Sequence, residues 1–126
     1  MRGDVHIHSK YSPDSKLEPD QIVKTAKSKD LDFIAISDHN RFVEHKLDFL
    51  LINGEEVSSE DGHILALFIN GEIPAGLSQE ETVDAIHDKN GCAHLLSFYL
   101  QTLFGRSVKK ESPALYLQEQ WFVFVK

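Results

Sequence analysis

Short apolar runs, each about as long as a β-strand, alternate with polar stretches along the chain. We expect strands at residues 5–8, 31–37, 47–52, 63–69 and 92–96. The centre of the second run, Phe33-Ile34-Ala35-Ile36, is continuously apolar, which is typical of a strand covered on both faces. The pattern of these runs therefore predicts a sheet whose strands are largely buried.

Two stretches between these runs have the pattern of amphipathic helices. The first begins near Pro19 and has one apolar face, formed by Ile22, Val23 and Ala26. The second begins with the capping box Ser78-x-x-Glu81, reaches about Asn90 and is expected to stop at Gly91. Strands and helices in this order predict an α/β domain.

Polar residues with metal-binding chemistry stand where the expected strands end. His6 and His8 lie one residue apart, so an extended backbone points both rings to the same side. The second run ends in Ser37-Asp38-His39-Asn40, and the third leads to Asn53-Gly54-Glu55-Glu56. The fourth run begins with His63, which reaches the same rim if that strand returns antiparallel to the third. Sites in α/β proteins collect at the carboxyl ends of parallel strands, so we expect these side chains to meet.

The candidate metal ligands are the histidines and acids near these strand ends: His6, His8, Asp14, Asp38, His39, Glu56, His63 and His94. Such a set would be a costly surplus of unpaired polar groups if it served packing alone. Imidazole with carboxylate suits zinc, manganese or iron and does not suit calcium. Glu56 is central to this hypothesis, because one carboxylate can bridge two cations about 3.5–4 Å apart.

Each residue taken singly has a simpler interpretation. A histidine near a strand end is usually a hydrogen-bonded packing residue, and Glu55 and Glu56 would be solvated acids. Nucleophilic catalysis by Cys92, or by Ser9 or Ser37 beside a histidine, is the rival chemistry. It requires a histidine that is free to act as a base, and metal binding would remove that base.

Composition narrows the classes of function. The chain has 126 residues, enough for one domain, and a formal net charge of −7. That charge repels polyanions, so we expect no nucleic-acid partner other than a short substrate. A single cysteine excludes an internal disulfide framework and suits a reducing compartment. We find no secretory signal and no apolar run long enough to span a bilayer, so we expect a cytoplasmic protein.

Five motifs, taken in order, resemble the PHP (polymerase and histidinol phosphatase) family. They are Asp4-Val5-His6-Ile7-His8-Ser9, Ser37-Asp38-His39-Asn40, Gly54-Glu55-Glu56-Val57-Ser58, Gly62-His63-Ile64-Leu65 and Ala93-His94. The resemblance covers about residues 1–94. It implies a distorted (βα)7 barrel, similar to a TIM barrel, with up to three divalent metals at the carboxyl ends of its strands. It also implies hydrolysis of phosphate esters.

The resemblance assigns ligands position by position: His6, His8 and Glu56 to a first metal, Glu56, His63 and His94 to a second, and Asp14 and His39 to a third. It implies that a hydroxide bridging two metals at Glu56 attacks phosphorus. His39 is one candidate for the acid that protonates the leaving group, and the family's C-terminal histidine, which is missing here, is the other. Asp38 would orient its neighbours. Lys10 and Arg106 could contact the phosphate.

The match ends with the fifth motif, because no histidine follows His94 and Leu95 replaces the usual proline. We therefore expect a partial barrel, with a metal-binding half-barrel at residues 1–96 and a divergent tail at residues 97–126. Two functions follow as hypotheses: a metal-dependent hydrolase of a phosphomonoester or of a nucleotide or oligonucleotide phosphate, and a metal-binding remnant with impaired catalysis. The apolar residues 121–125 could also pair two copies into a dimer.

Overall fold

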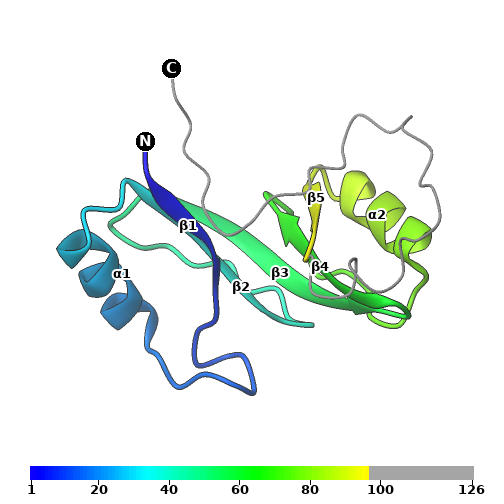
Figure 1. Cartoon of the computed structure of the whole chain (residues 1–126), viewed down its shortest axis with the longest axis horizontal. Helices are drawn as coiled ribbons and strands as arrows, with labels where there is room; N and C mark the ends of the chain where they lie inside the picture. Colours follow the sequence, from blue (N-terminus) through cyan, green and yellow to red (C-terminus); the bar gives the residue numbers. More distant parts are fainter. Residues whose placement is uncertain (97–126) are drawn as a thin grey trace, which may run out of the picture.

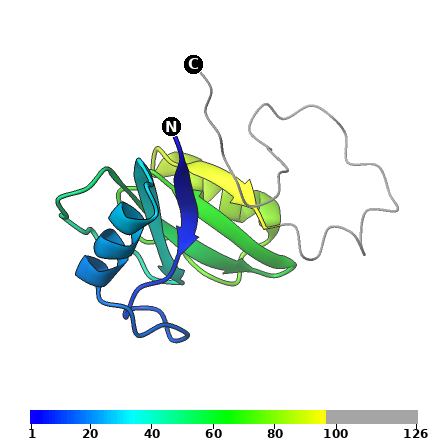
Figure 2. The ribbon, with the colours of Figure 1, turned by 60° about the vertical axis from the view of Figure 1, so that its left-hand side comes forward.

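The computed structural model describes residues 1–96, which form one five-stranded sheet flanked by two helices (Figure 1). The strands follow the order β1-β2-β3-β4-β5 across the sheet, and their bounds are Gly3–Ile7, Phe33–His39, Leu51–Ser59, Gly62–Leu67 and Cys92–Leu95. Strands β1, β2 and β3 run parallel, whereas β4 is antiparallel to both β3 and β5. Seen from a second direction, the sheet curls into half a barrel (Figure 2).

The expected α/β class is confirmed, and the curled sheet corresponds to part of a barrel. A full (βα)7 barrel is not present in residues 1–96. The expected return of the fourth strand is also confirmed, because Ser58 of β3 lies opposite His63 of β4. The predicted C-terminal strand, the divergent tail and the dimer that this strand would form lie outside the described residues. Within residues 1–96, we find no helix long and apolar enough to cross a membrane.

Helix α1, Pro19–Ser28, covers the β1–β2 side of the sheet. Its buried residues Ile22, Val23 and Ala26 pack against Ile34 and Ile36 of β2. The helix starts with a proline in its first turn and a reciprocal capping pair, in which the backbone N–H of Glu18 donates to Oε1 of Gln21 at 3.1 Å. The predicted apolar face is therefore the face that the helix buries.

Helix α2, Gln79–Asp88, buries Ile86 against Val57 of β3 and Ile64 and Ala66 of β4. Its predicted capping box is confirmed: Ser78 Oγ accepts from the Glu81 backbone N–H at 3.2 Å, and Glu81 Oε2 accepts from the Ser78 N–H at 3.0 Å.

The predicted role of Gly91 as the helix stop is wrong. Asn90 takes the left-handed backbone after α2, with a φ of 59°, because asparagine tolerates this conformation better than most residues. Gly91 serves close packing instead. A Cβ there would lie 2.4 Å from Ile69 Cγ2 and 2.9 Å from the Leu67 carbonyl oxygen.

The third strand differs most from its prediction. We expected an apolar strand at residues 47–52 with acids beyond its end, but β3 starts at Leu51 and carries Glu55 and Glu56 in its interior. Glu55 is wholly buried, so its interpretation as a solvated acid is wrong. The strand tolerates this carboxyl group because the backbone N–H of Ile73 donates to Oε2 of Glu55 at 2.9 Å.

Candidate metal centre

The register of the sheet brings the predicted ligands into one row. His39 of β2 lies opposite Glu56 of β3, Glu56 lies opposite Leu65 of β4, and Leu65 lies opposite His94 of β5. Residues opposite one another in a sheet share a face. Because Ile64 and Ala66, the neighbours of Leu65, pack against α2, the row lies on the face turned away from that helix.

Strand β1 reaches this row through an irregular end. Its register with β2 shifts between Asp4 and Ile7, and such shifts re-aim side chains. Ile7 packs with the α1 cluster, while Val5 packs on the opposite face with Leu65. The shift thus directs His6 and His8 towards Glu56.

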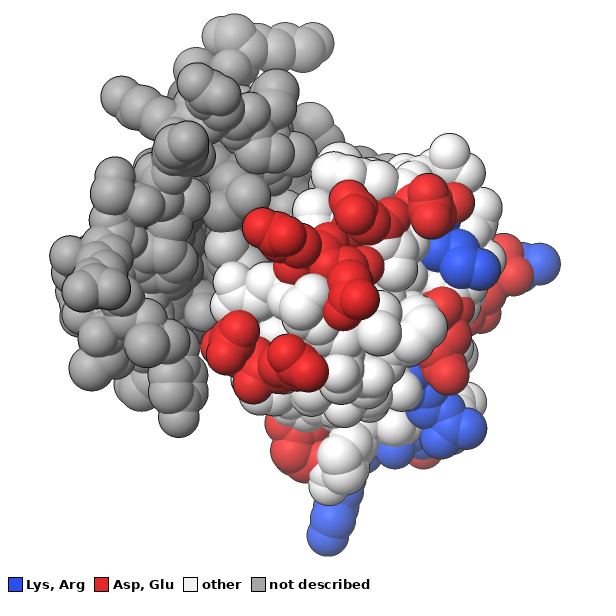
Figure 3. All heavy atoms as spheres, turned by 90° about the vertical axis from the view of Figure 1, so that its right-hand side faces the viewer, with Lys and Arg blue, Asp and Glu red and all other residues white. Residues whose placement is uncertain are grey.

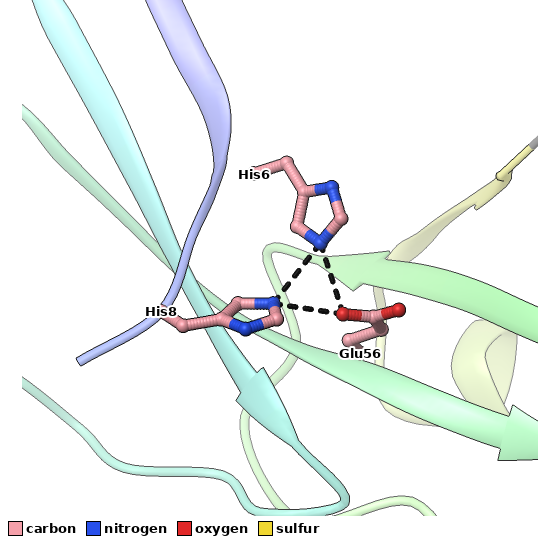
Figure 4. Close-up of side chains that lie close together, drawn as sticks. All are labelled: His6, His8 and Glu56. Carbon is pink, nitrogen blue, oxygen red and sulfur yellow. Dashed lines mark hydrogen bonds and ion pairs between the residues drawn. The ribbon is translucent and has the colours of Figure 1, made fainter. Parts of the chain in front are cut away.

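His6, His8 and Glu56 form the tightest group (Figure 4). Glu56 Oε2 lies 2.9 Å from His6 Nε2 and 2.8 Å from His8 Nε2, and the two nitrogens are 3.0 Å apart. With metal–ligand bonds of about 2.0–2.1 Å, neighbouring donors are roughly 2.8–3.0 Å apart at right angles and roughly 3.3–3.4 Å apart at tetrahedral angles, so the observed separations match right angles. The spacing and the donor chemistry therefore fit a divalent transition metal.

The same carboxylate faces two further imidazoles. Glu56 Oε1 lies 3.2 Å from His63 Nδ1, and Oε2 lies 3.5 Å from His39 Nε2. These three residues form a second potential metal group. Glu56 has a side chain only 6% exposed, so both of its oxygens are committed to this ring of imidazoles. A carboxylate with donors on both oxygens has the arrangement that bridging requires.

Asp14 joins His8 and His39 from the loop after β1. Its Oδ2 lies 2.9 Å from His8 Nδ1 and 3.4 Å from His39 Nε2, and the three residues form a third potential group. Ser12, which the sequence did not single out, supports this group. Its Oγ donates to Asp14 Oδ1 at 2.6 Å and accepts from the His39 backbone N–H at 3.2 Å.

Asp38 is buried on the other side of β2 and holds the chain beside His8. Its Oδ1 accepts from the Ser9 backbone N–H at 2.6 Å, and its Oδ2 accepts from Ser9 Oγ at 2.7 Å. Ser9 is itself wholly buried. The carboxylate therefore fixes the residue that follows His8, and this contact is of the kind that orients a metal ligand.

His94 lies in the ligand row but outside the potential metal groups. It occupies the row opposite Leu65, but it belongs to none of the three potential metal groups found among residues 1–96. Its role as a ligand stays a prediction, as does the assignment of each of the other ligands to a particular metal.

The electrostatics of the centre follow from these contacts. The Glu56 carboxylate, with Asp14, raises the pKa of His8 to about 8 against the opposing effect of burial. Burial alone would raise the pKa of Glu56, but hydrogen bonds from His6 and His8 hold it well below its usual range. The Ser12 hydroxyl, with His8, lowers the pKa of Asp14 to about 2. The carboxylates are thus ionised at neutral pH, and the ring of His8 must lose a proton before it can bind a metal.

The chain is similar to known proteins over most of its length. The family model described as PHP domain matches residues 4–105. The uncharacterized protein MJ1587 of Methanocaldococcus jannaschii is 38% identical over 111 residues, which cover 74% of this chain and 65% of the relative. The uncharacterized protein MJ0417 of the same organism is 35% identical over 95 residues, which cover 75% of this chain and 38% of the relative. The chain therefore spans less than two thirds of either relative.

A solved structure shares the fold. It is a two-domain protein from Bacteroides vulgatus that contains a predicted PHP-like metal-dependent phosphoesterase. It superposes with a TM-score of 0.60 at 20% sequence identity, over 75% of this chain and 34% of that protein. The family match, which covers most of the chain and all five motifs, shows that this protein belongs to the PHP domain family.

Proposed function

We propose that this protein is a metal-dependent phosphoesterase that hydrolyses a phosphomonoester or the phosphate of a nucleotide or short oligonucleotide. The observation that carries the proposal is Glu56, a buried carboxylate whose oxygens face His6, His8, His39 and His63. Membership of the PHP domain family supports it, as does the name of the Bacteroides vulgatus neighbour.

In this proposal, divalent metals lower the pKa of water and offset the charge of the phosphate oxygens. Water adds to phosphorus, the bond to the ester oxygen breaks, and the leaving alkoxide takes up a proton. Glu56, His6 and His8 would hold a metal, while Asp14 would fix the ring of His8 through Nδ1. His39 has one of two roles, because its Nε2 cannot bind a metal and carry the proton for the leaving group at the same time.

The test is phosphate release from a panel of small phosphomonoesters with manganese, zinc or iron. We expect turnover that depends on added metal, and we expect Glu56→Gln to lose it by about 100-fold or more, since the amide keeps the size and removes the charge. Glu60→Gln is the matched control because Glu60 is exposed at the β3–β4 turn. A wild-type protein without turnover on any ester and metal would contradict the proposal.

A specific observation favours the second hypothesis, a metal-binding protein without catalysis. The three potential groups share members, so residues 1–96 supply only six different side chains: His6, His8, Asp14, His39, Glu56 and His63. Three catalytic metals need about nine protein ligand positions, because each keeps a position open for water, and these six side chains reach that number only if three of them each hold two metals. Elemental analysis separates the hypotheses: one or two tightly bound ions without hydrolysis support the second, and metal-dependent turnover supports the first.

A further inference from the structure

Asp14 differs from the other members of the potential metal groups because it stands on a loop, well past the end of β1 at Ile7. Half of its side chain is exposed. An exposed carboxylate on a loop samples several rotamers unless a neighbour holds it. The carboxylate of Asp14 contacts His8, His39 and Ser12. Since the two histidines are themselves candidate ligands, Ser12 is the contact that is left to hold it.

The Ser12 hydroxyl joins this loop ligand to the end of β2. Its Oγ donates to Asp14 Oδ1 at 2.6 Å and accepts from the His39 backbone N–H at 3.2 Å. A serine hydroxyl has one proton to donate, so that proton is committed to Asp14. Because Oδ1 is occupied in this way, Oδ2 is the oxygen that remains towards His39 Nε2, at 3.4 Å. Ser12 therefore determines which oxygen of Asp14 faces His39.

Ser12 is itself held in place by the sheet. It is only 3% exposed, and its backbone N–H donates to the carbonyl oxygen of Ser9 at 2.9 Å. Ser9 is in turn fixed by the buried carboxylate of Asp38. Asp38 and His39 are consecutive residues of β2, so the end of this strand holds the loop at two points. The position of Asp14 relative to His39 is thus set by β2 as well as by the loop.

We propose that Ser12 is a positioning residue of the candidate metal centre, which acts by holding Asp14 against His8 and His39. The inference rests on the metal binding that the proposed function requires, and it does not depend on hydrolysis. Both oxygens of Asp14 lie within 3.0 Å of His8 Nδ1, so the same contact keeps the carboxylate in place to orient that ring. Without the hydroxyl, Asp14 has to be ordered when the metal binds, and this ordering lowers the affinity.

The test is a double-mutant cycle of Ser12→Ala and Asp14→Ala, in which metal-free protein is titrated calorimetrically with Mn²⁺. We expect each single variant to bind Mn²⁺ about tenfold or more weakly than the wild type, the usual effect of losing a partner of a metal ligand. Because Ser12 acts through Asp14, adding Ser12→Ala to Asp14→Ala should weaken binding no further. Ser59→Ala is the matched control, since Ser59 Oγ donates to the Gly62 carbonyl at 2.8 Å at the β3–β4 turn, outside the metal groups.

A crystal structure of the wild-type protein with Mn²⁺ gives a second readout, which does not depend on how the variants fold. Ser12 Oγ should stay bonded to Asp14 in it, and a hydroxyl that turns away from Asp14 or binds the ion overturns the inference. Equal Mn²⁺ affinity in wild-type and Ser12→Ala proteins overturns it as well. So does a further loss of affinity in the double variant, because Ser12 would then act independently of Asp14.

The two proposals fail in different ways. Metal binding without hydrolysis of any phosphomonoester counts against the proposed function and leaves the double-mutant cycle to decide the role of Ser12. A wild-type protein that binds no Mn²⁺ contradicts both proposals.

Discussion

The imidazole of His8 uses both of its nitrogens, with Nε2 towards Glu56 and Nδ1 towards Asp14. In the metal-free protein, this pair of carboxylates favours the charged ring, which is why the pKa of His8 rises from 6.5 to about 8. A metal at Nε2 needs the neutral ring, and Asp14 then accepts a hydrogen bond from Nδ1–H. Without metal, the carboxylates of Glu56 and Asp14 therefore keep a proton on the His8 ring. With metal, Asp14 orients that ring.

This competition predicts opposite effects of pH on stability and on metal binding. The contribution of charged His8 to the stability of the metal-free protein is fully present below pH 6.5 and is lost as the pH rises through about 8. Over the same interval, the affinity for Mn²⁺ should rise by up to tenfold per pH unit. The reason is that a growing fraction of His8 is already neutral, and metal binding no longer has to displace its proton. Calorimetric titrations at pH 6.5, 7.5 and 8.5, in buffers of different ionisation enthalpy, measure both the affinity and the protons released.

His8→Gln should bind Mn²⁺ more weakly and release fewer protons at pH 7.5. His87→Gln is the control, because His87 is exposed in the last turn of α2 and belongs to none of the metal groups. An affinity that stays constant between pH 6.5 and 8.5 would show that no imidazolium has to be deprotonated at the centre.

Glu55, next to Glu56 in β3, has the opposite electrostatic environment. Burial raises its pKa to about 7 in spite of the hydrogen bond from Ile73, and nearby Glu72 adds to the effect. In the unfolded chain this carboxyl has a pKa of about 4.5. Between pH 4.5 and pH 7, the folded protein therefore keeps a proton on Glu55 that the unfolded chain has lost. The stability that depends on neutral Glu55 is present below pH 4.5 and is lost as the pH rises through 7.

We therefore expect Glu55→Gln to flatten the pH dependence of stability. The amide stays neutral and still offers an oxygen to Ile73, so the melting temperature of the variant should fall less than that of the wild type between pH 5 and 8. Thermal unfolding of metal-free protein at four pH values tests this, with Glu60→Gln as the exposed control. Parallel pH profiles for Glu55→Gln and the wild type would mean that Glu55 is ionised throughout.

At the scale of elements, the contact between β3 and β4 sets the geometry of the centre. Gly54 lies opposite Leu67, and a Cβ at this glycine would be 2.6 Å from the carbonyl oxygen of Ala66. A backbone atom cannot move aside as a flexible side chain can, so a methyl group here would push the strands apart. Glu56 and His63 stand on these two strands, and their approach depends on the same contact.

Gly54→Ala should therefore lower the free energy of unfolding by about 1–3 kcal/mol, the usual cost of overpacking, and weaken metal binding at the same time. Gly71→Ala is the control, because the nearest atom to its added Cβ is the flexible Lys89 Nζ at 3.4 Å. Urea unfolding and Mn²⁺ titration of both variants measure the two effects. A Gly54→Ala protein with wild-type stability would show that β3 and β4 can separate at no cost.

The elements differ in how far the sequence predicts them. Helix α2 was predictable because its capping box is a local signal that the structure retains. Strand β3 was not, because the apolar pattern of residues 47–52 ends before the strand does. Leu47 and Phe49 pack against the α1 cluster from outside β3, and the acids within β3 are compensated by partners distant in sequence, Ile73 for Glu55 and the histidines for Glu56. Periodicity alone carries no information about such partners.

At the scale of the whole molecule, the charge is distributed unevenly. Exposed acids gather on the side that carries α2 (Figure 3), among them Glu80, Glu81, Asp84 and Asp88. Lys10 and Arg41, which belong to the loops after β1 and β2, both lie beside the ring of Tyr11. The sequence shows the total charge of −7 and most of the candidate ligands. It does not show the contact between Tyr11 and Arg41, because these residues come from two loops that are distant in sequence.

The candidate ligands also tie together parts of the chain that are distant in sequence, because they come from the ends of β1 and β2, from β3 and from β4. A ligand that binds only the folded state stabilises it by about 2.7 kcal/mol at a concentration 100 times its Kd. For a domain of this size, we expect Mn²⁺ at that concentration to raise the melting temperature by roughly 10 °C over protein in EDTA. Thermal unfolding monitored by circular dichroism measures this shift under both functional hypotheses, because it needs metal binding and no catalysis.

Glu56→Gln decides whether the shift comes from this centre. The variant loses the charge that faces the imidazoles, so its melting temperature in Mn²⁺ and in EDTA should differ by no more than a few degrees. Glu60→Gln should keep the full shift, because Glu60 lies at the β3–β4 turn, outside the metal groups. An equal rise in Glu56→Gln and wild-type protein would mean that the ion stabilises the fold from elsewhere. The convergence of the strand ends on Glu56 would then be a packing arrangement without a metal.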